Sequence, residues 1–131
     1  MTDLWVLDAS AVLAYLQGES GAEQVAEALK RTVVMSAVNW AEVLSKLADW
    51  GKKPDEALRM LAFSTLRILA FNERDANEAA SLRTLTREAQ LSLADRCCLA
   101  TARLLGVPVL TADRVWGDLE IGVAVELIRH R

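Results

Sequence analysis

Near its N-terminus the chain reads Leu4-Trp5-Val6-Leu7-Asp8-Ala9-Ser10, followed directly by Ala11-Val12-Leu13-Ala14-Tyr15-Leu16-Gln17-Gly18. The first four of these residues form a short apolar run that is typical of a buried strand, and the run after Ser10 has the composition of a helix that Gly18 ends. A strand that enters a helix through a brief polar turn is the opening of a strand–helix–strand unit. Asp8 stands in that turn, directly after the predicted strand.

The same alternation continues along the chain. We predict further strands at residues 32–35, 66–71, 107–110 and 122–128. We predict further helices that begin at Ser20, at Ser36 (to about Trp50), at Pro54 (to about Phe63), at Glu73 (to about Glu88) and at Ser92 (to Leu105). Strands that alternate with helices and are apolar on both faces predict an α/β fold, a three-layer α/β/α sandwich with a central parallel sheet of about five strands. Residues 1–131 show no linker or repeat, so we expect one domain.

The composition is that of a globular chain, because 53% of the 131 residues are hydrophobic and the formal net charge is −3. The negative charge argues against broad electrostatic capture of nucleic acid by a basic surface. No apolar run approaches the roughly 18 residues that span a bilayer, and the N-terminus has no basic region, so we expect a cytoplasmic protein with no membrane contact. Cys97 and Cys98 are neighbours in the sequence, which rules out a disulfide framework.

Acidic residues recur where the predicted strands end. Asp8 and Asp113 follow the first and fourth strands, Asp95 lies in the first turn of the helix that begins at Ser92, and Glu42 lies about two turns into the helix after the second strand. Open α/β sheets bind ligands at the carboxyl ends of their strands, so we expect the four carboxylates to converge there. Each also has a local interpretation: Asp8 and Asp113 as helix N-caps, Asp95 as half of a capping box, and Glu42 as a solvated surface acid.

Four converging carboxylates favour a divalent cation. Two like charges 4 Å apart repel by about 4 kcal/mol at an effective dielectric of 20, and a bound cation removes that cost. Carboxylates are hard oxygen ligands, which suit Mg²⁺ or Mn²⁺ better than Zn²⁺. The single histidine, His130, excludes RNA cleavage by a pair of histidines, and no Gly-rich phosphate loop is present.

Several segments together are similar to the PIN-domain family, and most similar to the VapC toxins of type II toxin–antitoxin systems. They are residues 6–11 (Val-Leu-Asp-Ala-Ser-Ala), 36–43 (Ser-Ala-Val-Asn-Trp-Ala-Glu-Val), 91–95 (Leu-Ser-Leu-Ala-Asp), 99–103 (Leu-Ala-Thr-Ala-Arg) and 108–113 (Pro-Val-Leu-Thr-Ala-Asp). The resemblance covers the whole chain in order and spacing.

This resemblance implies a parallel-sheet α/β/α sandwich, an Mg²⁺- or Mn²⁺-dependent endoribonuclease, a homodimer, and inhibition by a cognate antitoxin that inserts a segment near the acidic pocket. Asp8, Glu42, Asp95 and Asp113 match the acidic quartet of the family, Ser10 and Thr111 match hydroxyl positions beside it, and Asn39 is a neighbour. One departure is that a glycine often precedes the segment at 91–95, where this chain has Gln90 and Leu91.

The expected chemistry is hydrolysis of RNA by water that a metal ion activates, which leaves 5′-phosphate ends. Asp8, Asp95 and Asp113 are the expected metal ligands, with Glu42 as a further ligand or as the residue that orients the water. Candidate RNA contacts are Arg96, Arg103, Arg114, Lys46, Lys52 and Lys53, although for any one of them an ordinary solvated charge is the favoured interpretation. Trp116 is a candidate for stacking on a base, whereas Trp5, Trp40 and Trp50 are expected in the core or an interface.

Two other functions fit parts of the pattern. A non-catalytic module would use the same acidic pocket to dock RNA or a basic peptide. A receiver-like phosphoacceptor domain would need an acceptor Asp after the third strand and a Lys after the last, and the sequence offers neither clearly. The helices at about 38–50 and 54–63 form an apolar pair that we expect at a dimer interface.

Overall fold

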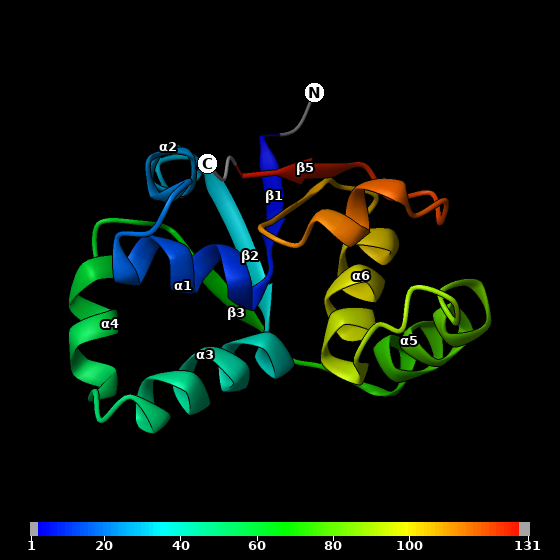
Figure 1. The fold of residues 1–131 in the computed structure, drawn as a ribbon, viewed down its shortest axis with the longest axis horizontal. Coiled ribbons are helices and arrows are strands. Elements are labelled where there is room, and N and C mark those ends of the chain that lie inside the picture. The colour runs from blue at the N-terminus through cyan, green and yellow to red at the C-terminus, as the bar shows by residue number, and fades with distance from the viewer. Residues whose placement is uncertain (1–2, 129–131) are drawn as a thin grey trace.

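The computed structural model describes residues 3–128, which form one parallel sheet between two layers of helices (Figure 1). The strands are β1 (Leu4–Leu7), β2 (Thr32–Ser36), β3 (Arg67–Leu69), β4 (Val109–Thr111) and β5 (Val125–Leu127). The helices are α1 (Ala9–Gln17), α2 (Ala22–Leu29), α3 (Ala37–Asp49), α4 (Pro54–Leu61), α5 (Glu73–Leu85), α6 (Leu93–Leu105) and the short 3₁₀ helix η1 (Arg114–Asp118). The predicted α/β/α sandwich with five parallel strands is confirmed.

The strand order is β3-β2-β1-β4-β5, and every neighbouring pair is parallel. Val6 at the centre of the sheet lies opposite Val34 on one side and Val109 on the other. The chain moves outward from β1 to β3 and then returns to place β4 on the other side of β1. The carboxyl ends of β1 and β4 therefore flank the point where the direction of winding reverses, which is where open α/β sheets bind ligands. A receiver-like domain has the order 2-1-3-4-5, so this topology differs from it.

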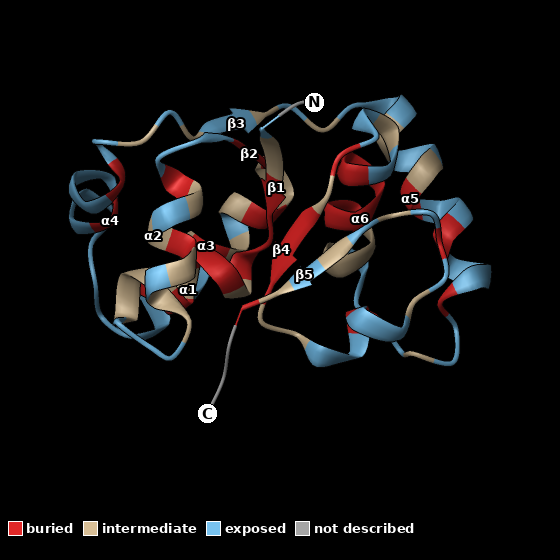
Figure 2. Cartoon of the chain, turned by 90° about the horizontal axis from the view of Figure 1, so that it is seen from above, coloured by how far each residue is buried: buried red, intermediate tan, exposed pale blue. Residues whose placement is uncertain are grey.

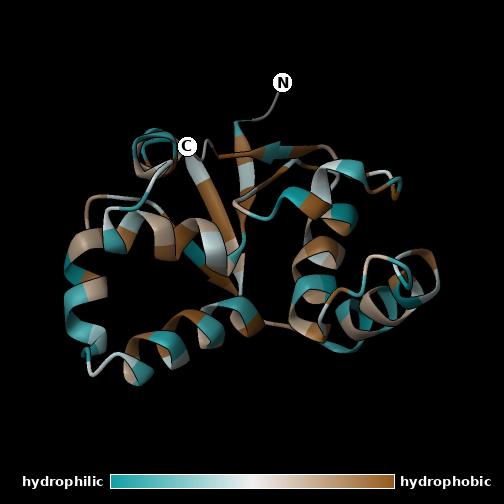
Figure 3. Cartoon of the chain, in the orientation of Figure 1, coloured by the Kyte–Doolittle hydropathy of each residue, from teal (hydrophilic) through white to brown (hydrophobic). Residues whose placement is uncertain are grey.

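Successive side chains of the three central strands, β1, β2 and β4, enter different cores, one on each face of the sheet. Leu7 and Met35 pack with α1, α2, α3 and α4, whereas Val6 and Val34 pack with α5, α6 and η1. The strands are therefore apolar on both faces, as their sequences predict. Figure 2 shows the buried residues along the central strands and on the inner faces of the helices, whereas the edge strands β3 and β5 are more exposed, and Figure 3 shows polar residues on the outer faces of the helices.

Local caps place the helices that surround the carboxyl edge of the sheet. Ser36 begins α3 directly after β2, because its side chain accepts a hydrogen bond from the N–H of Val38. Gly18 and Gly106 end α1 and α6 in the left-handed conformation, with φ of 65° and 68°. Helix α3 runs past the ends of the strands, as Figure 1 shows, and contacts both α1 and α6.

The structure differs from the sequence predictions mainly at element ends. Gly21 rather than Ser20 occupies the N-cap of α2, at φ 93°. The strands β3, β4 and β5 are shorter than predicted, because hydrogen bonding to a neighbour, rather than an apolar run, sets where a strand ends. Within residues 3–128 no helix has the length and apolar character needed to cross a bilayer. His130 lies outside the described residues.

Candidate active site

A cleft of about 190 Å³ opens at the carboxyl ends of β1 and β4, beside α1, α3 and α6. Its lining consists of Asp8, Ala9, Ser10, Leu13, Asn39, Glu42, Lys46, Asp95 and Asp113. All four acidic residues predicted from the sequence therefore line one cleft, although they are far apart along the chain. The topology accounts for this, because Asp8 follows β1 and Asp113 follows β4, the adjacent strand.

Asp8 is the most deeply buried of the four acids, with 5% of its surface exposed. It is the N-cap of α1, and its Oδ1 accepts hydrogen bonds from the N–H of Ala11 (2.8 Å) and from Ser10 Oγ (2.8 Å). Its Oδ2 accepts from Thr111 Oγ1 at 2.6 Å. Burial raises the pKa of Asp8 from 3.8 to about 6; these hydrogen bonds oppose the rise, and the nearby charge of Asp95 adds to it.

Two hydroxyl groups tie the loop after β4 to Asp8. Ser10 Oγ accepts the N–H of Ala112 at 2.9 Å, and Thr111 Oγ1 accepts the N–H of Asp113 at 3.0 Å. Each hydroxyl thus donates to the Asp8 carboxylate and accepts from the backbone on the neighbouring strand end. The structure places Ser10 and Thr111 beside the quartet, where the resemblance put them, and they fix Asp8 relative to the backbone of Asp113.

Glu42 is half-buried on α3, and Asn39 Nδ2 donates a 2.8 Å hydrogen bond to its Oε1. Burial raises the pKa of Glu42 above its ordinary value; the bond from Asn39 lowers it, the charge of Asp95 raises it and that of Lys46 lowers it. The charge of Asp95 thus raises the pKa of both Asp8 and Glu42.

Asp95 and Asp113 also cap helices, as the local interpretation predicted. Asp95 forms a capping box with Ser92 at the start of α6, in which its Oδ2 accepts the Ser92 N–H at 3.1 Å. Asp113 is the N-cap of η1, and its Oδ1 accepts the N–H of Val115 at 3.0 Å. Each acid therefore combines a local structural role with a position on the cleft.

The donor set of the cleft suits a hard divalent cation, because it offers four carboxylates, a hydroxyl and an amide but no thiolate or imidazole. Asn39 Oδ1 adds a buried oxygen that accepts no hydrogen bond from residues 3–128. Within the same residues, however, no three His, Cys, Asp or Glu side chains are grouped so that they could hold an ion as they stand. The four acids therefore share a cleft, as expected, but no three of them within residues 3–128 lie close enough together to hold an ion. Each carboxylate accepts hydrogen bonds from nearby donors. Some of these side chains would therefore have to rotate before they could bind an ion directly.

Of the residues predicted to contact RNA, some line the cleft and others do not. Lys46 lines the cleft, but Arg96 and Arg114 are not among its lining residues. Arg103, in the last turn of α6, is not among the lining residues either, and it forms a 3.4 Å ion pair with Glu78 of α5. Trp116 is fully buried, so the prediction that it stacks on a base is wrong.

The burial of Trp116 has a physical cause that its local sequence hides. Arg114, Gly117 and Asp118 surround it with polar or small residues, yet η1 turns its indole into the core shared by α5 and α6. Leu13, which lines the cleft, was also missed. Its position in the sequence could have predicted this, because Leu13 lies four residues after Ala9 in α1 and therefore shares a helix face with it.

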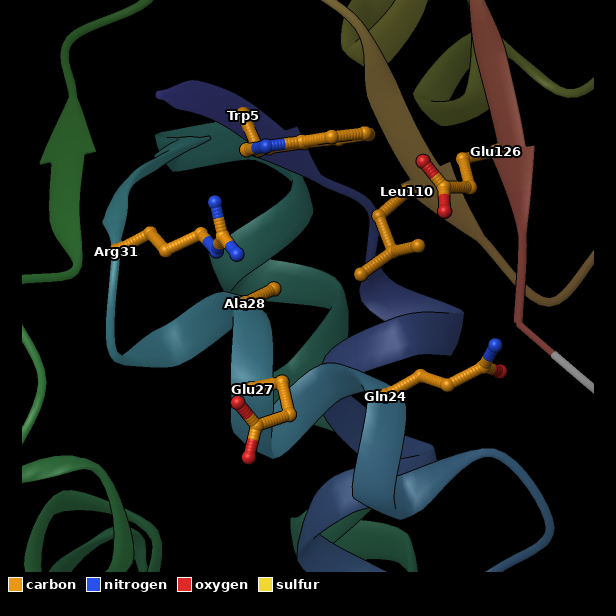
Figure 4. A pocket seen from close by; sticks show the side chains of 7 residues that line it. All are labelled: Trp5, Gln24, Glu27, Ala28, Arg31, Leu110 and Glu126. Atoms are coloured by element: carbon orange, nitrogen blue, oxygen red, sulfur yellow. The ribbon is translucent and has the colours of Figure 1, made fainter.

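A second cavity, of about 330 Å³, lies between α2 and the sheet (Figure 4). Its lining consists of Trp5, Gln24, Glu27, Ala28, Arg31, Leu110 and Glu126. Arg31 pairs with Asp3 at 3.4 Å and Glu27 pairs with Lys30 at 3.0 Å, so much of the charge around this cavity is already neutralised. It has an apolar floor and an exposed polar rim, without the concentrated charge of the acidic cleft.

A family of protein domains and several solved structures are similar to this chain. The model of the PIN domain matches residues 5–121. A toxin–antitoxin complex from Klebsiella pneumoniae is similar in structure, with a TM-score of 0.70, 25% identity, and coverage of 91% of this chain and 94% of that chain. VapBC-5 from Mycobacterium tuberculosis gives a TM-score of 0.64 at 26% identity, with 98% and 99% coverage.

VapC20 from Mycobacterium tuberculosis, a toxin that cleaves the sarcin–ricin loop, gives a TM-score of 0.70 and coverage of 92% and 98%. Its identity is 17%, so this likeness shows the fold alone. Among curated proteins none matches the sequence significantly.

Proposed function

The chain belongs to the PIN domain family, and from this premise we propose that it is a VapC-type endoribonuclease that needs Mg²⁺ or Mn²⁺ and hydrolyses RNA phosphodiester bonds. The observation that carries the proposal is that Asp8, Glu42, Asp95 and Asp113 line one cleft at the topological switch point of the sheet. RNA is the favoured substrate because the sequence segments that carry these four acids resemble those of the VapC toxins, and that resemblance implies an endoribonuclease.

The charge of the cleft requires a cation before RNA can enter. Lys46 is the one cationic side chain among the residues of 3–128 that line it, against four carboxylates. A phosphodiester would therefore meet net negative charge. When bound, a divalent ion supplies positive charge that neutralises the phosphate and lowers the pKa of a water molecule.

The residues of this chain then divide the work of binding and orientation. Asp8, Asp95 and Asp113 would hold the ion, with Glu42 either as a further ligand or as the acceptor that orients the attacking water. Asp8 is preorganised for this, because Ser10, Ala11 and Thr111 fix both of its carboxylate oxygens. Lys46, which lines the cleft, would contact a phosphate oxygen of the bound RNA.

We propose two protein partners in the cytoplasm. The first is a cognate antitoxin, since the Klebsiella structure is a toxin–antitoxin complex and VapBC-5 belongs to a family of such systems. The second is another copy of this chain. The α3–α4 region exposes large apolar side chains that suit an interface, at Trp50, Leu58, Met60 and Phe63.

The test is to incubate the purified chain with total RNA and Mg²⁺, Mn²⁺ or EDTA, and to map the new 5′ ends. We expect cleavage that leaves 5′-phosphates, stops in EDTA and is lost in Asp8→Asn and Asp95→Asn. Products with 2′,3′-cyclic phosphates would overturn hydrolysis by water. RNA binding that persists without cleavage would favour the non-catalytic module.

A further inference from the structure

Asn39 connects the two helices that carry Glu42 and Asp95. It lies on α3 with 1% of its surface exposed. Its Nδ2 donates to Glu42 Oε1 at 2.8 Å, within the same helix, and to the carbonyl oxygen of Ala94 at 3.0 Å, in the first turn of α6. Both N–H groups of one amide are therefore used, one on each helix.

The chemistry of the partners fixes the orientation of this amide. Glu42 Oε1 and the Ala94 carbonyl are both acceptors, so an amide turned the other way would place Oδ1 against two oxygens. In the observed orientation Oδ1 is buried and receives no hydrogen bond from residues 3–128. A buried unpaired acceptor lowers stability, and Asn is a poor helix former. Residues that break such local rules are found mainly at functional sites, and the position of Asn39 on the lining of the cleft points to a role there.

The two bonds of Asn39 act on the part of the cleft where like charges meet. Ala94 directly precedes Asp95, and the Asp95 charge acts unfavourably on Glu42. Left alone, the half-buried Glu42 side chain would move away from Asp95 into solvent. The neutral donor Nδ2 opposes this movement, because it holds Oε1 while it is itself anchored to α6.

We propose that Asn39 is a positioning residue that holds the Glu42 carboxylate against the first turn of α6, so that Glu42 and Asp95 act on the same cation. This inference rests on the proposed metal-dependent function. In this role Asn39 acts through the bond from its Nδ2 to Glu42, whereas direct binding of the ion by its Oδ1 would weaken Mn²⁺ binding equally with and without Glu42. The alternative is that Asn39 only ties α3 to α6.

A double-mutant cycle on Mn²⁺ affinity separates these two roles. Asn39→Ala, Glu42→Gln and the double variant are titrated with Mn²⁺ alone, by calorimetry. We expect Asn39→Ala to weaken binding by about 10- to 100-fold, the range found when a residue behind a metal ligand is removed. In the Glu42→Gln background the same change should alter the affinity by less than about twofold, because the effects of coupled residues are not additive. Unchanged affinity in Asn39→Ala, or equal losses in both backgrounds, would overturn the proposal.

Two further variants control for folding and for shape. Asn39→Asp keeps the shape of the side chain but removes the donor, and we expect it to weaken Mn²⁺ binding at least as much as Asn39→Ala. Asn72→Ala removes an asparagine that caps α5 away from the cleft, and it should lower thermal stability without changing Mn²⁺ affinity. A weaker affinity in Asn72→Ala would mean that general destabilisation explains the effect.

A measurement on the metal-free protein keeps this inference distinct from the proposed function. The side-chain amide of Asn39 is assigned by NMR from its absence in Asn39→Ala. We expect both protons to exchange slowly with solvent, and one to lose protection in Glu42→Ala. Rapid exchange of both protons in the unaltered chain would overturn the bridge, even if Mn²⁺ binds. If the unaltered chain binds no Mn²⁺, the proposed function fails, and the positioning role toward a cation fails with it even where the protons are protected.

Discussion

Thr111 Oγ1 donates a 2.6 Å hydrogen bond to Asp8 Oδ2, between the carboxyl ends of two adjacent strands. The same oxygen accepts the backbone N–H of Asp113 at 3.0 Å. One buried hydroxyl therefore contacts both the carboxylate of Asp8 and the backbone at the start of the segment that carries Asp113. It stabilises the ionised form of a carboxylate that burial otherwise disfavours.

Thr111→Val keeps the shape of the side chain and removes this donor. We expect the pKa of Asp8 to rise further above its ordinary value, and cleavage near neutral pH to fall by roughly tenfold, as when a partner of a metal ligand is lost. Thr111→Ser retains the hydroxyl and should keep most of the activity. The measurement is the pH dependence of the cleavage rate. The prediction would be contradicted if the cleavage rate rose with pH around the same midpoint pH in the unaltered chain and in Thr111→Val.

Asp8 should also make stability depend on pH. Its pKa is raised from 3.8 to about 6 on folding, so the folded protein binds the proton more tightly than the unfolded chain does. The contribution of Asp8 to stability is complete below the unfolded pKa and is lost as pH rises through about 6. The loss amounts to roughly 3 kcal/mol.

Asp8→Asn lacks this titration. Relative to the unaltered chain, we expect the variant to gain roughly 2 kcal/mol in the free energy of unfolding between about pH 4 and pH 7, in metal-free buffer. Urea unfolding at several pH values measures the difference. A difference that stays constant with pH would show that Asp8 does not titrate in this way.

Local chemistry explains why much of the fold was predictable. Apolar runs give the strands, and Ser36, Ser92, Gly18 and Gly106 act as helix caps in the structure as they do in the sequence pattern. The convergence of the acids followed from the rule for strand ends in a parallel sheet.

Contacts between distant segments were not predictable. The bond from Asn39 to the Ala94 carbonyl depends on how α3 crosses α6, which no local pattern records. The burial of Trp116 depends on the packing of η1 against the core under α5 and α6. The orientation of each carboxylate toward its nearby donors is also not predictable from the sequence, because Glu42 bonds the Asn39 side chain whereas Asp95 and Asp113 bond backbone N–H groups. In this arrangement no three of the acidic residues in 3–128 are grouped for an ion.

Mg²⁺ should stabilise the folded chain, because it relieves repulsion among the carboxylates of the cleft. A ligand present at 100 times its Kd adds about 2.7 kcal/mol. We expect the rise in Tm with Mg²⁺ to be larger at about pH 7.5 than at about pH 5, since protons compete for Asp8, whose pKa is about 6. Asp95→Asn should show little of this rise. An equal rise in NaCl of matched ionic strength would indicate screening rather than binding.

The exposed apolar side chains of α4 should hold a second copy of the chain. Leu58 is 54% exposed, and we expect Leu58→Glu to convert a dimer into a monomer in sedimentation at micromolar concentration, because a buried charge without a partner opposes association. Leu85→Glu, at an equally exposed leucine on α5, is the matched control and should remain dimeric. An unaltered chain that sediments as a monomer would refute the proposed dimer.

Trp116 should matter for stability and not for RNA. Its side chain is fully buried, so Trp116→Leu leaves a cavity and should lower the free energy of unfolding by less than the about 3–5 kcal/mol of a change to Ala. Its buried Nε1 has no acceptor among residues 3–128, so the loss of that donor adds no penalty. At a temperature where the variant is folded, RNA affinity measured with the Asp8→Asn background should be unchanged. A base stacked on the indole would instead contribute about 1–3 kcal/mol to RNA binding. A loss of affinity of that size in the folded variant would show that Trp116 contacts RNA.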